Sequence, residues 1–387
     1  MRKNIIIMNI TVALFWMSVY SYVPNLPKYS ESLGADAVVL GIIGGVYGVA
    51  QIILRIPIGM ISDNTGKNRL IMVIGSVVLV LSCGLLILAN DTGMIVLGRL
   101  IAGAAAAWWV VQSAVYAEYF NEAQQIKAQG VIGASSNWGK LVAALVGGMM
   151  AQYFGLHSVF IFAFVVAVVC IFLTLQIKDI PKVREVKPVL KSLRELIPML
   201  KSRDMIVFSI IGILTNILCF SAPTYFTAIA AENLGANSMD IGLLNVVFYL
   251  IGAATSMLVG TRLYKKVGGI HAMAVSFIIC GFSCIPFFYH INVQVIFLME
   301  ALAGVCFGVT AGAAAGMVLR SVAPDQRGAA TGIYQSLYGI GILIGPMLVG
   351  GLIKYASFDT SYWALAAIGA LSAVFCYAFV PQKYARM

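Results

Sequence analysis

Long apolar runs dominate the chain, and short polar segments separate them. A helix that crosses a bilayer needs about 20 consecutive, mostly apolar residues, and twelve runs of about that size can be placed along the sequence. They lie near residues 5–27, 38–61, 69–89, 92–117, 127–152, 156–177, 205–230, 238–262, 271–289, 292–320, 326–353 and 361–380. Most connections are only a few residues long, so consecutive spans must be antiparallel neighbours. The pattern predicts an all-α integral membrane protein with twelve transmembrane helices.

One connection is longer and strongly charged. Residues 178–204 carry eight Lys or Arg and four Asp or Glu residues, and they separate six predicted spans in residues 1–177 from six in residues 205–387. Apolar residues recur in this segment at helical spacing, at Leu190, Leu193, Leu196, Ile197 and Leu200. We therefore predict two six-helix bundles joined by a basic amphipathic helix that lies on the inner membrane surface.

The two predicted bundles are repeats of one another. A constant shift of 201 residues aligns Glu31-Ser32-Leu33-Gly34-Ala35 with Glu232-Asn233-Leu234-Gly235-Ala236. The same shift pairs Gly41 with Gly242, Gly59 with Gly260, and Gly103 with Gly304. Parallel repeats occur in secondary transporters, where the substrate site lies at the repeat interface near the bilayer midplane.

Composition and charge agree with a membrane location. Of the 387 residues, 61% are hydrophobic and 10% are charged, and the mean hydropathy of +0.94 lies outside the range of soluble domains. The first run continues past Trp16 without a cleavage site, so we interpret it as a span rather than a leader. The net charge of +10 does not indicate nucleic-acid binding, because 20 of the 25 Lys and Arg residues fall on one set of loops and tails. This bias predicts a multi-pass protein of the cell inner membrane with both termini cytoplasmic.

No pattern in the sequence indicates an enzyme, a cofactor or a metal site. The seven cysteines lie in apolar segments without metal-like spacing, and we interpret them as small, reduced core residues: Cys83, Cys170, Cys219, Cys280, Cys284, Cys306 and Cys376. The three histidines lie near predicted span ends, and neither a Ser-His-Asp constellation nor a nucleotide-binding P-loop is evident.

A polar turn between the second and third spans carries the most specific motif, Gly59-Met60-Ile61-Ser62-Asp63-Asn64-Thr65-Gly66-Lys67-Asn68-Arg69. Asp63 is expected to end one helix, and Gly66 to permit a left-handed turn. This turn resembles the signature loop of the major facilitator superfamily. Leu97-Gly98-Arg99-Leu100-Ile101-Ala102-Gly103 resembles its fourth-span motif. The segment from Gly339 to Gly351 resembles the Gly/Pro motif of its antiporters, although in the eleventh span rather than the fifth.

The resemblance covers essentially the whole chain and is nearest to the drug and metabolite efflux branch, whose members are proton antiporters. The fifth span departs from the antiporter pattern, because Ala144 stands where a proline is expected. The resemblance implies the major facilitator fold and a functional monomer that works by alternating access. It also implies that Asp63 locks the signature loop against the eleventh span in the outward-facing state. The other residues of this conformational gate are Gly59, Gly66, Lys67, Arg69, Arg55, Gly345 and Pro346.

Four ionisable residues lie well inside predicted spans: Arg55, Arg99, Lys140 and Glu300. Each costs at least about 2.5 kcal/mol at the bilayer centre unless it faces a cavity or a partner. Arg99 and Glu300 are repeat equivalents, and we assign proton coupling to them. An ion pair of Glu300 with Lys140 stays open as an alternative, as do Asp63 and Glu118 as proton carriers. Lys140 is the best candidate for contact with a substrate or counter-ion.

Polar and aromatic residues within the spans are candidates for lining a substrate cavity. Together with Lys140, they are Trp16, Tyr20, Gln112, Tyr116, Asn137, Trp138, Tyr225, Asn245, Tyr249, Tyr334, Gln335 and Tyr338. Trp108 and Trp109 are adjacent, so at most one of them can face the cavity.

The function predicted from these features is secondary active transport of a small organic molecule, most simply proton-coupled efflux of an amphipathic or anionic solute. Uptake or exchange of an organic anion that binds Lys140 is the alternative within transport. A membrane sensor that does not transport is a remote alternative. The expected partners are the small-molecule substrate, membrane lipid and protons.

Overall fold

The computed structural model describes residues 2–120, 124–179, 197–259, 266–323 and 326–384, apart from the side chains of residues 63, 125–127 and 384. Every regular element in these ranges is helical, which confirms the predicted all-α class. The predicted amphipathic helix of the basic linker falls largely on residues 180–196, outside the described residues. Residues 260–265, which the 201-residue shift pairs with the start of the signature loop, also lie outside them.

The helices fall into an N-terminal half and a C-terminal half. The N-terminal half contains α1 (Arg2–Ser21), α2 (Leu26–Ser32), α3 (Ala37–Thr65), α4 (Asn68–Ile87), α5 (Thr92–Ala107), α6 (Trp109–Glu118), α7 (Gln125–Phe154) and α8 (Ser158–Thr174). The C-terminal half contains α10 (Arg203–Ser221), η2 (Ala222–Phe226), α11 (Thr227–Asn233), α12 (Ser238–Leu258), α14 (Gly269–Ser283), η3 (Pro286–His290), α15 (Val293–Arg320), α16 (Arg327–Tyr355), α17 (Phe358–Phe379) and η5 (Gln382–Tyr384).

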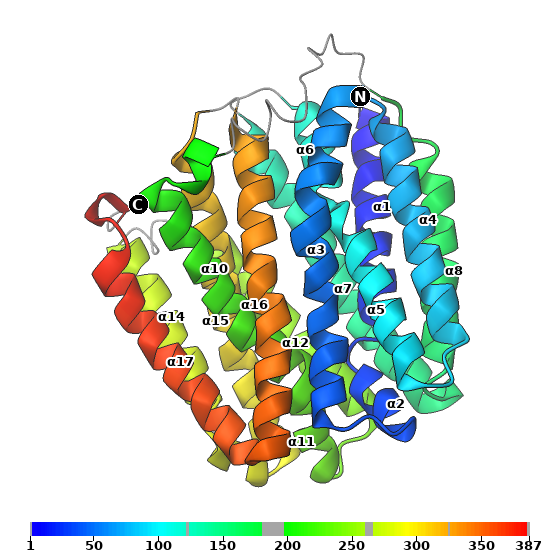
Figure 1. The fold of residues 1–387 in the computed structure, drawn as a ribbon, viewed down its shortest axis with the longest axis vertical. Helices are drawn as coiled ribbons and strands as arrows, with labels where there is room; N and C mark the ends of the chain where they lie inside the picture. The colour runs from blue at the N-terminus through cyan, green and yellow to red at the C-terminus, as the bar shows by residue number, and fades with distance from the viewer. Residues whose placement is uncertain (1, 121–123, 180–196, 260–265, 324–325, 385–387) are drawn as a thin grey trace.

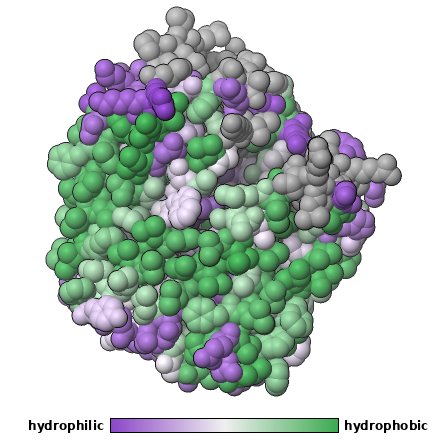
Figure 2. Space-filling view, turned by 180° about the vertical axis from the view of Figure 1, so that it is seen from behind, coloured by the Kyte–Doolittle hydropathy of each residue, from purple (hydrophilic) through white to green (hydrophobic). Residues whose placement is uncertain are grey.

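Nine segments of the described chain are helical, long and apolar enough to cross a membrane. The helices α8 and α14 are apolar but shorter, with 17 and 15 residues. The helix α7 has 30 residues but carries a polar stretch in its middle. Hydrophobic residues form a broad band across the middle of the face shown in Figure 2, and hydrophilic residues gather toward the two ends of the molecule. The chain is therefore a multi-pass membrane protein.

Most helices pack within their own half, and two pairs make the main contacts between the halves. In the N-terminal half α1 packs against α7 and α8, and in the C-terminal half α12 packs against α15 and α14 against α17. The two crossing pairs are α3 with α16 and α7 with α12. Figure 1 shows α3 and α16 side by side in the centre of the molecule.

Glycines at equivalent repeat positions make equivalent close contacts. A Cβ on Gly103 would lie 2.2 Å from the Tyr47 carbonyl oxygen, and one on Gly304 would lie 2.6 Å from the Phe248 carbonyl oxygen. Tyr47 and Phe248 are themselves separated by the same 201-residue shift. The sequence repeat is thus matched by repeated packing of α5 on α3 and of α15 on α12, where glycine lets the backbones approach closely.

The crossing pairs use glycine in the same way. A Cβ on Gly41 would lie 2.6 Å from the Pro346 carbonyl oxygen, and one on its repeat partner Gly242 would lie 2.6 Å from the Ala144 carbonyl oxygen. These contacts bring α3 against α16 and α12 against α7 without intervening side chains. Pro346 and the neighbouring Gly345, both assigned to the gate, therefore lie in the helix that contacts the opposite half.

Replacing Gly242 with valine is expected to separate α12 from α7 and to lower transport strongly. Overpacking a close contact costs about 1–3 kcal/mol. Here it would destabilise the conformation in which α12 and α7 hold the two halves together. The matched control is Gly351→Val in α16, because no heavy atom lies within 4 Å of a Cβ at that glycine. Transport by Gly242→Val at the rate of Gly351→Val, with equal amounts of folded protein, would contradict the expectation.

Ion pairs join the halves at the end of the molecule opposite the chain termini, where Figure 1 shows α2 and α11. Lys28 Nζ lies 2.5 Å from a carboxylate oxygen of Glu232, and Lys354 Nζ lies 2.6 Å from one of Asp36. Asp36 also accepts a hydrogen bond from the Val39 amide at the start of α3, at 2.9 Å. Both pairs therefore connect one half to the other at this end.

The Asp36 pair is expected to weaken at low pH. The Lys354 ammonium and the Val39 amide together hold the pKa of the Asp36 carboxyl below its ordinary value. Because the pairing lowers this pKa, its contribution to closure is fully present above the ordinary carboxyl pKa and is lost as the pH falls through the lowered value. Spin-label distances across this end should lengthen over that acidic range in the wild type but not in Asp36→Asn.

Neutralising both pairs together is expected to shift the conformational equilibrium toward separation at this end. For the double variant Asp36→Asn/Glu232→Gln we expect a shift of about a few-fold, since exposed ion pairs contribute little. The control is Asp359→Asn, which removes a 2.7 Å pair with His290 at the same end but within the C-terminal half. An equal shift in the control would show that the cross-half pairing is not responsible.

Candidate central binding site

A cavity of about 310 Å³ lies between the two halves. Its walls come from α1, α3, α6 and α7 on one side and from α10, η2, α12, α15 and α16 on the other. We call the side of the molecule that carries the chain termini the terminal side. The cavity reaches residues near the helix ends on this side, including Gln129 in α7, Leu319 in α15 and Thr331 in α16. Since the ion pairs join the halves at the opposite end, the cavity extends toward the terminal side in this conformation.

The leading helix of each half is interrupted next to the cavity. In the N-terminal half α1 ends at Ser21 and α2 begins at Leu26 with Pro27 in its first turn. In the C-terminal half α10 ends at Ser221 and continues as the π-helix η2, which contains Pro223. Proline and π-helical turns free backbone groups inside a membrane helix, and such broken helices recur at transporter binding sites.

Lys140 provides a cation on the cavity wall. Its Nζ lies 4.6 Å from the centroid of the Trp16 ring and 5.1 Å from that of the Tyr20 ring, so both rings stabilise the charge by cation–π attraction. Asn137 lies almost one turn earlier on α7 and lines the same cavity. Among the described residues no ion pair joins Lys140 to Glu300, and the alternative pairing is absent from this conformation.

Trp138 does not line the cavity, contrary to the prediction. Its side chain is 60% exposed on the outer surface of α7. Successive residues on a helix point about 100° apart, so Asn137 and Lys140 share the cavity face while the residue after Asn137 turns away from it.

Arg55 joins the two halves within the cavity. Its guanidinium donates one hydrogen bond to the Gln335 backbone carbonyl in α16 and another to the Gln51 side chain on its own helix. The guanidinium carbon also lies 4.9 Å from the Tyr338 ring centroid. Arg55 therefore couples α3 to α16, as a residue of a gate would.

The structure places the other predicted lining residues in two groups. Those that line the cavity are Trp16, Tyr20, Tyr249, Tyr334, Gln335 and Tyr338. Those that are buried elsewhere are Gln112, Tyr116, Tyr225 and Asn245. Tyr116 accepts a hydrogen bond from Asn9 at 3.0 Å, and Asn245 donates one to the Ile241 carbonyl of its own helix at 3.4 Å, so both are used in helix packing.

Sequence reasoning missed several lining residues, among them Tyr47, Gln51, Thr215, Asn216 and Phe248. The repeat could have indicated Tyr47 and Phe248, because they stand at equivalent positions. Trp109 lines the cavity. Trp108 instead packs against Gly75 of α4, where an added Cβ would lie 2.5 Å from the tryptophan ring. This agrees with the expectation that at most one member of the tryptophan pair faces the cavity.

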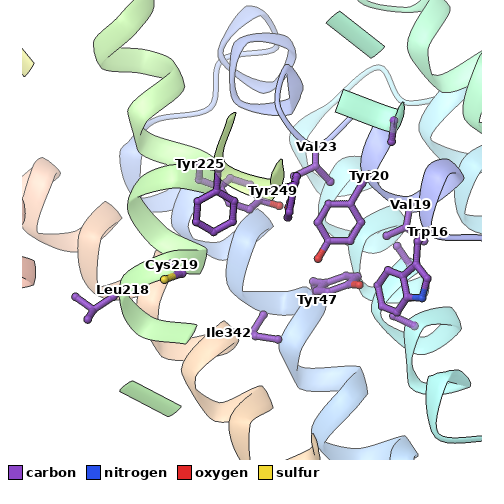
Figure 3. Packing of buried hydrophobic residues seen from close by; sticks show 14 of the residues in the cluster. Trp16, Val19, Tyr20, Val23, Tyr47, Leu218, Cys219, Tyr225, Tyr249 and Ile342 are labelled. Atoms are coloured by element: carbon purple, nitrogen blue, oxygen red, sulfur yellow. The ribbon is translucent and has the colours of Figure 1, made fainter. Parts of the chain in front are cut away.

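Aromatic rings meet across the boundary between the halves, as Figure 3 shows for Trp16, Tyr20 and Tyr47 opposite Tyr225 and Tyr249. The rings of Tyr20 and Tyr249 are 5.8 Å apart in an edge-to-face arrangement. The rings of Tyr47 and Phe220 are stacked at 6.1 Å. These contacts provide flat, partly apolar walls that suit an aromatic or amphipathic solute.

The repeat-equivalent residues Arg99 and Glu300 are both buried, and neither is among the residues that line the cavity. The Arg99 guanidinium carbon is 4.4 Å from the Tyr47 ring centroid, and its Nη1 lies 3.4 Å from the Tyr22 hydroxyl. Glu300 in α15 is only 1% exposed, and neither carboxylate oxygen has a hydrogen-bond partner in the part of the chain that the structure describes. The Thr227 hydroxyl is close to it but does not complete a hydrogen bond.

The signature loop connects α3 to α4 at the terminal side. Gly66 has a φ of 65° and its amide donates to the Ser62 carbonyl, which confirms the predicted left-handed turn. The helix continues through Asp63 to Thr65, so Gly66, rather than Asp63, terminates it. The Asp63 side chain lies outside the described residues. Asp179, which sequence reasoning did not single out, accepts a 2.7 Å hydrogen bond from the Arg69 amide and places a negative charge at the start of α4.

A many-spanning helical chain with a cavity lined from two halves defines a membrane transporter of small molecules. The chain belongs to the Major Facilitator Superfamily, whose sequence profile matches residues 8–232 and 211–386. Membership of this family makes the protein a transporter rather than an enzyme.

Similar proteins include transporters of several kinds. The class E tetracycline resistance protein of Escherichia coli is 24% identical over 362 residues, which cover 90% of this chain and 87% of that protein. The crystal structure of nucleoside transporter NupG has a TM-score of 0.78 at 15% identity, over 97% of this chain and 98% of that one. That of a D-xylose-proton symporter has a TM-score of 0.78 at 15% identity, over 99% and 98%. At this identity the two structures show the shared fold alone.

Some matches are partial. An uncharacterized transporter of Buchnera aphidicola is 26% identical over 166 residues, and this stretch covers 41% of the present chain and 42% of that protein.

Proposed function

We propose that the protein is a proton-coupled secondary transporter that exports an amphipathic or anionic organic molecule. In this proposal all twelve predicted spans cross the membrane, residues 1–177 and 205–387 form two six-helix bundles, and both termini are cytoplasmic. The bundles rock about the central cavity, so that it opens alternately to the two sides.

The charge of the cavity wall carries the proposal. Among its described lining residues are two cations, Arg55 and Lys140, and no carboxylate. Arg55 is engaged by Gln51 and Gln335. Among the described residues, the Lys140 ammonium group contacts the Trp16 and Tyr20 rings and has no hydrogen-bond or ion-pair partner, so it is available to a ligand. A solute with an anionic group beside Lys140 and an apolar body against the aromatic walls would match both the charge and the shape of the cavity.

The conformation supports alternating access. The cross-half ion pairs and glycine contacts join the bundles at the end opposite the termini, and the cavity extends toward the terminal side. With both termini in the cytoplasm, this is an inward-facing state. The gate assigned to Gly59, Asp63, Gly66, Lys67 and Arg69 would then close the terminal side in the opposite state.

Proton coupling is assigned to Glu300, with Arg99 as its repeat counterpart. An ionisable residue inside a membrane helix without a bonded partner is a functional site by default. Glu300 satisfies this description in the C-terminal half. The drug-resistance relative supports export.

Uptake or exchange of an organic anion is a second candidate, and the cation at Lys140 favours it equally. The two candidates differ in direction and in coupling to protons.

The deciding experiment uses the purified full-length protein in liposomes with a pH-sensitive dye inside. Gradients of anionic, neutral and cationic aromatic solutes are imposed in turn, and solute and proton movements are recorded together. The proposal expects saturable movement of an anionic or amphipathic solute with proton movement in the opposite direction. Anion movement without proton movement would leave the exchange candidate. Movement of cations alone would reject both, and an absence of all transport would favour the remote sensor alternative.

A further inference from the structure

Three cysteines that are far apart in the sequence meet inside the C-terminal half. Cys219 is in α10, Cys280 in α14 and Cys306 in α15, and their sulfur atoms all lie within 4.8 Å of one another. All three are at most 2% exposed. The thiol of Cys284, one turn beyond Cys280, adjoins the cluster. The sequence-based interpretation of separate, inert core cysteines is therefore incomplete, because three helices bring these thiols to one point.

We propose that Cys219, Cys280 and Cys306 form a binding site for one soft divalent metal ion of the zinc group, such as Zn²⁺ or Cd²⁺. This site adjoins the proposed solute site, because Cys219 also lines the central cavity, but metal binding can be tested without any transport measurement.

The sulfur positions suit a single ion. Zinc binds thiolate sulfur at about 2.3 Å, which separates two sulfurs of a tetrahedral site by about 3.8 Å. Sulfur atoms already within 4.8 Å reach that separation through small side-chain rotations. The site arises from three helices of one half, so an ion bound there would tie α10 to α14 and α15 without bridging the two halves.

The chemistry of the ligands selects the ion. Thiols bind soft or borderline metals, whereas magnesium and calcium require oxygen ligands. Metal-bound cysteine is the thiolate, so binding by all three residues would displace three thiol protons and leave a complex with one net negative charge. The released protons and the incoming ion can pass through the central cavity, because Cys219 lines it as well.

The test is metal binding by the purified, reduced, full-length protein in detergent, with Cd²⁺ as the probe. Thiolate coordination gives an ultraviolet charge-transfer band, and elemental analysis after desalting gives the number of ions bound. The proposal expects one tightly held Cd²⁺ per chain and release of about three protons per ion, measured in weak buffer. Absence of the band, or of retained Cd²⁺, in protein whose thiols are fully reduced would overturn it.

Cysteine substitutions locate the site. Cys280→Ser is expected to weaken Cd²⁺ binding by at least about tenfold. Loss of a residue that only hydrogen-bonds to a metal ligand already lowers metal affinity by about 10- to 100-fold. The matched control is Cys376→Ser, a fully buried cysteine of α17 in the same half, which should leave binding unchanged. Equal loss in both variants, or none in Cys280→Ser, would overturn the assignment.

Two further measurements keep the result decisive. If Cys280→Ser does not give a monodisperse protein, Cys219→Ala and Cys306→Ala replace it with the same expected loss. The free thiols of protein purified without reductant are counted after denaturation. Five free thiols out of seven in the wild type, together with all six remaining thiols free in Cys280→Ser, would show a disulfide between Cys280 and another cysteine. Failure of the reduced protein to bind Cd²⁺ would then make the disulfide the function of this cluster instead.

Discussion

Replacing Glu300 with glutamine is expected to abolish solute-driven proton movement while solute exchange continues. Glutamine keeps the shape of the side chain but cannot carry a proton at this position. Glu300 is 1% exposed and lies away from the cavity wall, so the substitution leaves the walls that contact the solute unchanged. In liposomes the proton signal should fall to that of protein-free vesicles. Exchange should stay within about fivefold of the wild type, the equivalent of one ordinary hydrogen bond.

Two observations would separate this role from a structural one. Glu300→Asp keeps an ionisable group one methylene shorter, and it should retain proton movement at a reduced rate. A glutamine substitution at Glu31, which lies in α2 at the end opposite the termini, should leave the ratio of protons to solute unchanged. If Glu300→Gln moved protons and solute in the wild-type ratio, Glu300 would not be the proton carrier. Asp63 and Glu118, the alternatives left open by the sequence, would then be the candidates.

Replacing Lys140 with methionine is expected to remove the preference for anionic solutes. A hydrogen bond to a charged group contributes about 1.5–3 kcal/mol, so KM for an anionic aromatic solute should rise on the order of 10- to 100-fold. A neutral solute of the same shape should be affected little, because methionine still packs against the Trp16 and Tyr20 rings that now hold the ammonium group. Initial rates of transport for a matched anionic and neutral pair measure the difference.

The controls for Lys140 come from the same helix. Lys140→Arg keeps the positive charge, and it should keep most of the selectivity between the anionic and the neutral solute. Trp138→Ala removes a larger side chain close by, but on the exposed face of α7, and should change neither KM. Equal increases in KM for the anionic and the neutral solute in Lys140→Met would show that the residue shapes the cavity rather than binding charge.

The positions of the helices were predictable from the sequence because hydrophobic burial in a bilayer acts on whole segments. The apolar run near 292–320 became α15 (Val293–Arg320), and that near 326–353 became α16 (Arg327–Tyr355). The glycine repeat was also visible, because a residue without a side chain is needed wherever two backbones touch. Gly66 was predictable for a local reason, since its left-handed turn depends on that residue alone.

The composition of the central site was only partly predictable, because a span that is apolar all round does not reveal which face meets the cavity. Asn137 and Trp138 are neighbours in sequence, yet one lines the cavity and the other is 60% exposed on the outside. The missed residue Tyr47 reads in sequence as an ordinary aromatic side chain within an apolar span. Packing of α3 against α5 and α16 places it on the wall.

By itself, the sequence determined the all-helical membrane class, most helix limits, the internal repeat and the four ionisable residues within the spans. These follow from local hydropathy and from spacing along one chain. Only the tertiary structure decided which residues share a surface. It placed Lys140 over two aromatic rings, left Glu300 without a bonded partner and brought Cys219, Cys280 and Cys306 together. The physical reason is that such contacts depend on how helices far apart in sequence rotate and cross, which is set by the packing of all of them at once.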